Sequence, residues 1–133
     1  MKEDPRTRSR IMRAVKGKDT TPELIVRRMV HAMGYRYRLH RKDLPGKPDM
    51  AFSKLHKVIF VHGCFWHGHD CARGARMPKA NAEYWFNKIT RNSLRDATHI
   101  EALKIQGWRI AVIWECELNK LERVRRRLAE FLN

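Results

Sequence analysis

The sequence predicts an α/β protein in which a mixed β-sheet lies between helices, and three observations lead to this fold class. Four short segments have strand patterns: "YRYRLH" alternates, whereas "MAF", "KVIFVH" and "WRIAVIW" are apolar. Three other segments carry apolar residues at helical spacing. The order helix, strand, strand, strand, helix, strand, helix favours a sheet covered by helices, and 133 residues favour one domain.

The helices have recognisable starts and ends. The first should begin with Thr21 as its cap and Pro22 in its first turn, and should end at Gly34. Residues 81–106 and 117–132 should form the other two helices. We expect the apolar stripe of the first helix at Leu24, Ile25, Arg28, Met29 and Ala32, where Arg28 contributes its stem. Trp108 and Trp114, on the last strand, are assigned to the core.

The charge of the chain indicates a polyanion as its partner. Lys and Arg number 29 against 14 Asp and Glu, which gives a formal net charge of +15. Nucleic acid is favoured over a membrane surface or a merely soluble basic protein, because the basic residues are spread over segments with secondary-structure patterns. Residues 1–19 are expected to form a basic arm along DNA, or else a disordered tail, and residues 20–133 the folded domain.

The sequence has no apolar run long enough for a bilayer span and no signal-peptide pattern. We therefore expect a cytoplasmic protein with no membrane partner. Three cysteines cannot all pair within one chain, and in this compartment a thiol is more often a metal ligand or a buried side chain.

A cysteine and histidine cluster is the first candidate site. Cys64, His69 and Cys71 form the pattern C-x4-H-x-C, and Cys116 follows the segment "WRIAVIW". Three sulfurs and one imidazole are a complete tetrahedral set for structural Zn²⁺. The alternative is that these are buried cysteines and unrelated surface groups.

A second candidate site begins at Asp49, in "PGKPDMAF". Many metal-dependent nucleases have a carboxylate at the start of one strand and an acidic-x-Lys triplet on the next. In this chain the triplet positions hold Phe60, Val61 and His62, so the second carboxylate and the lysine are missing. Pro-Asp is also common in turns, which is the alternative interpretation of Asp49.

The residues around Asp49 can still supply the chemistry of phosphodiester cleavage. Asp49 can hold Mg²⁺, with the backbone carbonyl of Val61 as a second oxygen ligand. His62 or His67 can accept the proton of the attacking water, and Glu23 can add a further carboxylate.

Four stretches then resemble one family. "LPGKPDMAF", "KVIFVHGCFWHGHDC", "AEYWFNKI" and "GWRIAVIWECEL" are similar to the very short patch repair (Vsr) endonucleases, over residues 7–118. The resemblance implies a restriction-endonuclease-like core with a structural zinc. It also implies Mg²⁺-dependent nicking of duplex DNA 5′ of the thymine in a T:G mismatch, the product of 5-methylcytosine deamination.

The resemblance also assigns roles to residues. Asp49 matches the metal-binding aspartate, His62 and His67 match the active-site histidines, and the zinc ligands match Cys64, His69, Cys71 and Cys116. Val61 stands where some members carry threonine, so the backbone carbonyl is the group expected to act there. Residues that match DNA-intercalating positions are Phe65, Trp66, Trp85 and, in the arm, Met12.

Other interpretations remain open for the aromatics and for the function. Core packing is the commoner fate of aromatic side chains and is the alternative for Phe65 and Trp66. A non-catalytic zinc-containing DNA-binding module is one alternative function, and a nuclease of the same fold with another target is the second. We expect a monomer, with T:G-mismatched DNA as substrate and mismatch-repair proteins as candidate partners.

Overall fold

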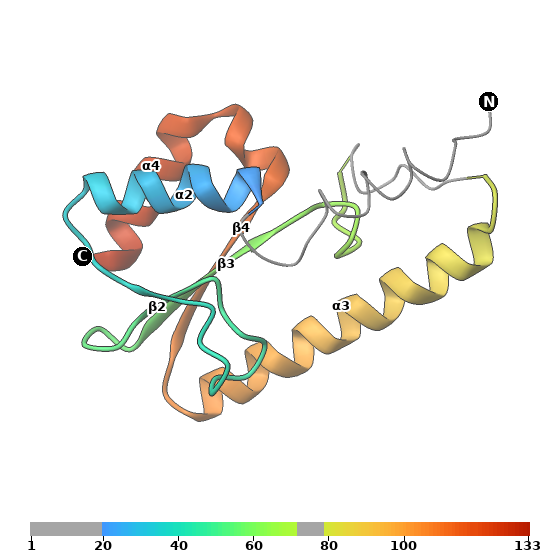
Figure 1. The fold of residues 1–133 in the computed structure, drawn as a ribbon, viewed down its shortest axis with the longest axis horizontal. Helices are drawn as coiled ribbons and strands as arrows, with labels where there is room; N and C mark the ends of the chain where they lie inside the picture. Colours follow the sequence, from blue (N-terminus) through green and yellow to red (C-terminus); the bar gives the residue numbers. More distant parts are fainter. Residues whose placement is uncertain (1–19, 72–78) are drawn as a thin grey trace.

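A four-stranded sheet with helices on both faces forms the protein in the computed structural model, which describes residues 20–71 and 79–133 (Figure 1). The predicted arm of residues 1–19, with Met12, lies outside the described residues. Along the chain, the elements are α2 (Thr21–Ala32), β1 (Arg38–Leu39), β2 (Met50–Phe52), β3 (Lys57–His62), α3 (Ala82–Ile105), β4 (Arg109–Trp114), the 3-10 helix η1 (Glu115–Asn119) and α4 (Leu121–Leu132).

The sheet is mixed, as predicted, with strand order β1-β2-β3-β4. β1, β2 and β3 are antiparallel neighbours, whereas β3 and β4 are parallel and are joined through α3. Ile59 pairs with Met50 on one side and with Ala111 on the other, so β3 is central. Because β2 begins where β3 ends, the start of β2 and the C-terminal ends of β3 and β4 share one edge of the sheet.

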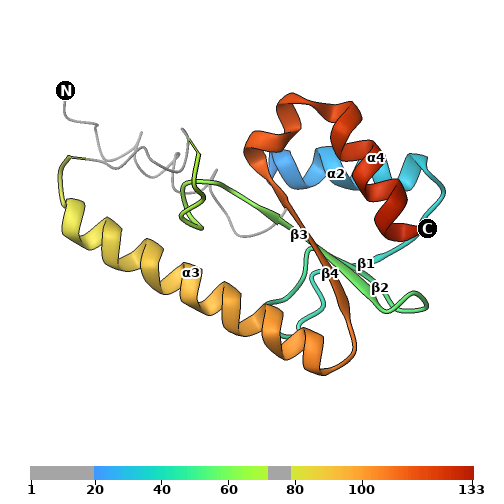
Figure 2. The ribbon, with the colours of Figure 1, turned by 180° about the vertical axis from the view of Figure 1, so that it is seen from behind.

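Each face of the sheet has its own apolar core, because successive strand residues point to opposite faces. Figure 2 shows α3 on the opposite side of the sheet from α2 and α4. The core under α2 and α4 contains Val26, Met29, Val30, Met50, Phe52, Ile59, Ala111, Ile113, Val124, Leu128 and Leu132. The core under α3 contains Leu44, Ala51, Val58, Phe60, Leu103 and Trp108.

The first helix differs from its prediction in its cap and in its buried face. Thr20, one residue earlier than expected, is the cap, and its hydroxyl accepts a hydrogen bond from the Glu23 N–H. The stripe expected at Leu24, Ile25, Arg28, Met29 and Ala32 is wrong except for Met29. The buried residues are Glu23, Val26, Met29 and Val30. The apolar pattern pointed to the wrong face because the true buried face contains a carboxylate.

Three further expectations change in detail. The strand predicted at "YRYRLH" is shorter than expected. Only Arg38 and Leu39 pair with β2, and they form the outer strand β1. The segment expected to begin the last helix at residue 117 is η1, and α4 begins at Leu121. Trp108 is buried as predicted, but Trp114 is only partly buried and contacts histidines instead of either apolar core.

Among the helices in the described part of the chain, none combines the length and the apolar character that a bilayer span requires.

The two-core arrangement predicts a large difference between two leucines of α4. Leu128 is fully buried, whereas Leu121 is 42% exposed. Leu128→Ala should lower the free energy of unfolding by about 2–5 kcal/mol, since it leaves a cavity against α2 and the sheet. Leu121→Ala is the matched control and should cost less than about 1 kcal/mol. Urea denaturation measures both, and equal losses would contradict the described packing of α4.

Candidate active site at the sheet edge

Asp49 lies directly before β2, at the edge where β3 ends. Its side-chain Oδ2 accepts a hydrogen bond of 2.6 Å from the backbone N–H of Val61. Asp49 is 8% exposed, so this carboxylate is held inside the fold and not on a turn at the surface. The contact fixes the carboxylate against the last residues of β3.

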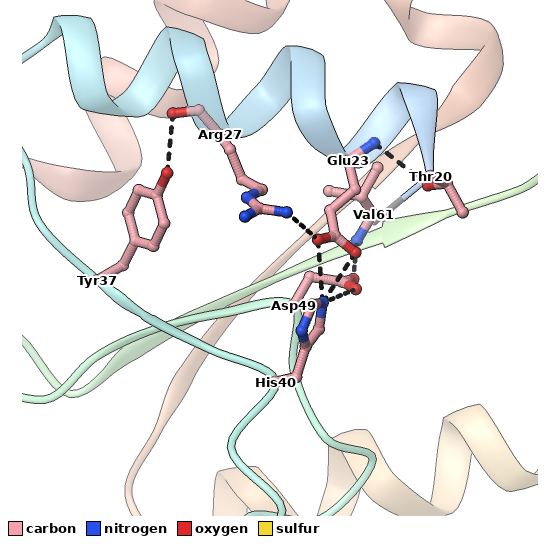
Figure 3. A network of polar contacts seen from close by, with 7 residues as sticks. All are labelled: Thr20, Glu23, Arg27, Tyr37, His40, Asp49 and Val61. Atoms are coloured by element: carbon pink, nitrogen blue, oxygen red, sulfur yellow. Dashed lines mark hydrogen bonds and ion pairs between the residues drawn. The ribbon is translucent and has the colours of Figure 1, made fainter. Parts of the chain in front are cut away.

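Glu23 reaches the same place from the first turn of α2 (Figure 3). This side chain is 1% exposed, and its Oε2 lies 3.0 Å from Nη1 of Arg27, one helical turn later. His40, which follows β1, completes the group, since its Nε2 lies 3.0 Å from Oε1 and 2.9 Å from Oε2 of Glu23. The same nitrogen lies 3.9 Å from Oδ1 of Asp49.

Burial raises the pKa of Asp49 to about 8. The hydrogen bond from Val61 acts in the opposite direction and lowers this pKa, whereas the adjacent Glu23 carboxylate raises it. Ionising Asp49 would therefore place a second negative charge beside Glu23 where water cannot solvate it well. A bound cation would remove this penalty, and the ligand atoms of Glu23, His40 and Asp49 lie within 4.8 Å of one another.

Two histidines occupy the other face of β3 at the same edge. His62 is the last residue of β3, and its ring stacks on that of His67 with centroids 3.9 Å apart and planes 5° apart. His67 Nδ1 lies 2.5 Å from Oδ2 of Asp96, which comes from the middle of α3. A carboxylate at Nδ1 accepts the proton there, and this tautomer leaves Nε2 of His67 as a proton acceptor.

His62 is neutral at physiological pH. Its side chain is buried, and burial lowers the pKa of His62 to about 4. The neighbouring His67 lowers this pKa further, and Asp96 raises it. Nδ1 of His62 is buried and has no hydrogen-bond partner among the described residues. His62 can therefore pack against His67 and offer a neutral ring, but it cannot carry a permanent positive charge.

The four predicted zinc ligands come together. Their ligand atoms lie within 4.8 Å of one another: Cys64, His69, Cys71 and Cys116. None of the three cysteines is in a disulfide. Cys64 Sγ accepts a hydrogen bond of 3.3 Å from the Cys116 backbone N–H, and His69 Nδ1 lies 3.5 Å from Cys116 Sγ. Three thiols and one imidazole are a ligand set that fits Zn²⁺. Burial raises the pKa of the Cys64 thiol to about 12, so a bound cation is needed to hold this side chain as a thiolate.

Trp114 joins this cluster to the histidine pair. Its indole stacks on the ring of His69 with centroids 4.1 Å apart, and the ring of His62 lies edge-on at 5.1 Å. His62 and Trp114 are register partners at the ends of β3 and β4. The earlier assignment of Trp114 to the core is therefore wrong, because the end of this face carries imidazoles and not apolar side chains.

The predicted aromatic residues also form one group. The rings of Phe65 and Trp66 lie 5.2 Å apart, and that of Trp85 lies 5.8 Å and 5.5 Å from them. All three are partly exposed and none belongs to the two apolar cores. Lys88 Nζ lies 5.5 Å from the Trp66 ring and 5.8 Å from the Trp85 ring, so a cation accompanies this aromatic surface.

Side chains of α3 hold the loop after β3 against that helix by hydrogen bonds. Asn92 Nδ2 donates to the Trp66 carbonyl at 3.0 Å, and Ser93 Oγ donates to the His67 carbonyl at 2.8 Å. Gly68 has φ +63°, and a Cβ there would lie 2.8 Å from the Ile89 side chain. A glycine is thus needed for the loop to approach α3 this closely.

The sequence reasoning missed two residues of the site, His40 and Asp96. The sequence predicted that Glu23, Asp49 and Val61 lie in one group and that His62 lies near His67, and the structure has these residues in those positions. His40 lies beside Asp49 because Leu39 pairs with Met50, a register that no local motif reveals. Asp96 is one acidic residue in a long charged helix, and nothing in its surroundings in the sequence marks it.

Carboxylates that could hold a divalent cation and an imidazole that can accept a proton lie at the same edge of the sheet, and metal-dependent nucleases use donors of both kinds. The fold and these side chains therefore fit the nuclease class of protein.

Comparison with known proteins identifies the family. The family model described as DNA mismatch endonuclease Vsr matches residues 2–73. The type II nicking enzyme V.XorIIP of Xanthomonas oryzae pv. oryzae (strain KACC10331 / KXO85) is 49% identical over 129 residues, which cover 97% of this chain and 94% of the relative. V.NmeAIP, a type II nicking enzyme of Neisseria meningitidis serogroup A, is 43% identical, with 91% and 86% covered. The DNA mismatch endonuclease Vsr of Escherichia coli (strain K12) is 38% identical, with 91% and 77% covered.

The chain therefore belongs to the Vsr DNA mismatch endonuclease family, and it is a DNA nicking endonuclease of that family.

The cysteine and histidine cluster predicts one zinc per chain. Cys116→Ala and His69→Ala should each lose the metal and lower the free energy of unfolding by at least about 3 kcal/mol, the contribution of a ligand present far above its dissociation constant. His31→Ala removes an exposed histidine of α2 and should keep both zinc and stability. Metal analysis and urea denaturation test this, and fully folded protein without zinc would contradict it.

The raised pKa of Asp49 predicts an unusual pH dependence of stability. Between the ordinary pKa of an aspartate and about 8, the folded protein binds one proton more than the unfolded chain, so stability falls as pH rises. Asp49→Asn removes this loss, and its stability advantage over wild type should grow by on the order of 2–4 kcal/mol from pH 5 to pH 8 without added divalent cations.

Urea denaturation across this pH range measures the difference between the two proteins. Glu130→Gln, which neutralises an exposed carboxylate of α4, is the control and should leave the wild-type slope unchanged. A difference between Asp49→Asn and wild type that does not vary with pH would show that the carboxylate is ionised throughout.

Proposed function

We propose that the protein is a Mg²⁺-dependent endonuclease that nicks duplex DNA 5′ of the thymine in T:G mismatches and so begins repair of deaminated 5-methylcytosine. The observation that carries the proposal is that one edge of the sheet holds both the Asp49 carboxylate and the imidazole of His67 paired with Asp96. The name of the E. coli relative, DNA mismatch endonuclease, supports the choice of substrate.

Asp49 and Val61 are the residues that would hold the cation. Oδ2 of Asp49 is engaged by the Val61 N–H, and Oδ1 faces His40. In an extended strand the N–H and C=O of one residue point to the same side, so the Val61 carbonyl faces the same edge as the Asp49 carboxylate. Oxygen donors of this kind suit Mg²⁺, which when bound would polarise the scissile phosphate and lower the pKa of water.

His67 would act as the base. Asp96 holds the Nδ1 proton of His67, which orients the ring and leaves Nε2 free to take a proton from the attacking water. The water oxygen forms a bond to phosphorus, the bond from phosphorus to one sugar oxygen breaks, and that oxygen takes a proton from water to become a hydroxyl, so that one strand is nicked. His62, which is neutral and stacked on His67, fixes the plane of that ring and adds no competing charge.

The zinc in this proposal is structural. Cys64, His69, Cys71 and Cys116 would supply the four ligands that structural Zn²⁺ takes and would leave no position for water or phosphate. Cys64, His69 and Cys71 belong to the loop after β3, and Cys116 belongs to η1 after β4. The metal would therefore hold that loop against the end of β4. Phe65, Trp66 and His67 lie between two of the ligands, so their placement depends on it.

Mismatch selection is assigned to the aromatic group of Phe65, Trp66 and Trp85. Inserting a ring between base pairs costs a few kcal/mol of stacking, and this cost is lower beside a mismatch, which is already poorly stacked. Attraction to phosphates comes instead from the excess of Lys and Arg and does not distinguish matched from mismatched duplex. Affinity and selectivity thus come from different residues.

Binding and nicking of labelled T:G and T:A duplexes of one sequence, with and without Mg²⁺, test the proposal. Wild type should nick the T:G duplex only with Mg²⁺, and Asp49→Asn should bind DNA normally but not nick it. Trp66→Ala should lose about 1–3 kcal/mol of T:G preference, the value of one base–aromatic stack, with no change in salt dependence. Phe86→Ala, which removes a 61% exposed aromatic of α3 outside the group, should keep that preference.

Each alternative has its own signature in this assay. Equal nicking of both duplexes would indicate a same-fold nuclease with another target, as the type II names of two relatives suggest for those proteins. Tight binding without nicking in any divalent cation would indicate a non-catalytic DNA-binding module. Full T:G preference in Trp66→Ala and in the matching Phe65 and Trp85 variants would show that the aromatics only pack.

A further inference from the structure

His40 lies at the metal-binding edge although no motif assigns it a role. Its Nε2 is 2.9 Å and 3.0 Å from the two oxygens of Glu23 and 3.9 Å from Oδ1 of Asp49. The ring therefore points its outer nitrogen into the space between two buried carboxylates (Figure 3). The side chain is 20% exposed, so the ring closes the group on its solvent side.

The backbone holds this position firmly. His40 follows β1, whose Leu39 pairs with Met50, and the His40 N–H donates to the Asp49 carbonyl at 3.3 Å. Residue 40 is thus the register neighbour of residue 49. His40 also has φ +47°, a left-handed conformation that non-glycine residues rarely adopt.

The three ligand atoms form a donor set that differs from a pure oxygen site. Glu23, His40 and Asp49 come from three separate segments, and their ligand atoms lie within 4.8 Å of one another. Mg²⁺ prefers carboxylate, carbonyl and water oxygens, whereas Mn²⁺ and Co²⁺ also accept an imidazole nitrogen. Arg27 already pairs with Oε2 of Glu23, so that carboxylate would keep a positively charged partner if Nε2 of His40 bound a metal.

We propose that His40 is a nitrogen ligand of the divalent cation at Asp49, so that this site binds Mn²⁺ in preference to Mg²⁺. The inference rests on the proposed function, since it concerns the same cation. In this arrangement Asp49 and Val61 supply oxygen donors, His40 adds nitrogen, and Glu23 supports the ring or contributes an oxygen. The competing role for His40 is a proton-bearing bridge between the two carboxylates that never contacts a metal.

Mn²⁺ alone is the probe, added to zinc-loaded full-length protein without DNA. Electron paramagnetic resonance measures its affinity, and electron spin-echo modulation detects a ¹⁴N nucleus bonded directly to Mn²⁺. Wild type should show ¹⁴N modulation. His40→Gln, which puts an amide near the position of Nε2, should lose the modulation and bind Mn²⁺ about tenfold or more weakly. Competition should show the affinity for Mg²⁺ changed by less than about threefold.

Two further variants protect the test against folding artefacts. His40→Asn also removes the imidazole and tolerates positive φ better than Gln, so it should behave like His40→Gln toward Mn²⁺. His31→Gln removes an exposed histidine and should keep wild-type affinity and modulation. Zinc content and circular dichroism must match wild type in each variant.

The outcomes separate this inference from the proposed function. Wild type that binds no Mn²⁺ or shows no ¹⁴N modulation, or His40 variants that keep wild-type Mn²⁺ affinity, would overturn the ligand role of His40. The proposed function would survive each of these results if Asp49→Asn still abolished Mg²⁺-dependent nicking. Asp49→Asn that nicks at the wild-type rate would instead overturn the proposed function itself.

Discussion

The hydrogen bond from the Val61 N–H to the Asp49 carboxylate is the constraint on which the candidate site depends. It fixes an acidic group at the point where β2 begins and β3 ends, inside the fold. Burial makes an ionised carboxylate costly, and Glu23 lies next to it. The partners around these two carboxylates offset part of that cost: Arg27 on Glu23, His40 between the two, and the Val61 N–H on Asp49. The remaining cost keeps Asp49 protonated up to about pH 8, and a divalent cation bound here would remove it.

On the opposite face of the same edge, one loop contains both the cysteine and histidine cluster and the candidate catalytic residue His67. The loop after β3 supplies three of the four cysteine and histidine ligands, and between them stand Phe65, Trp66 and His67. Side chains of α3 anchor this loop through the carbonyls of Trp66 and His67. α3 also provides Asp96, which contacts Nδ1 of His67. The same helix therefore fixes His67 twice, once through its backbone carbonyl and once through its ring.

The sequence predicted most elements of this fold, and the reasons for its failures are physical. Apolar segments gave the mixed sheet and the helix order, because burial on a two-faced sheet leaves a strong periodic pattern. That pattern misplaced the buried face of the first helix, since Glu23 is fully buried there and is paired with Arg27 of the same helix and with His40 on another segment. The cysteine and histidine cluster, which fits zinc, was found because three of its residues lie within one short motif. His40 and Asp96 were missed because strand register and helix docking, and not sequence proximity, bring them to Asp49 and His67.

The overall charge and the local charge of this protein have opposite signs, and this division separates binding from chemistry. A net charge of +15 attracts the DNA backbone from any direction, and salt screens that attraction. At the sheet edge, however, a phosphate would meet the Glu23 carboxylate and, once Asp49 ionises, a second buried negative charge, and both would repel it. A divalent cation placed between them reverses this local repulsion without altering the long-range field. DNA binding should therefore depend on ionic strength, whereas cleavage should depend on the cation. Neutralising one of these carboxylates should remove cleavage without weakening DNA binding.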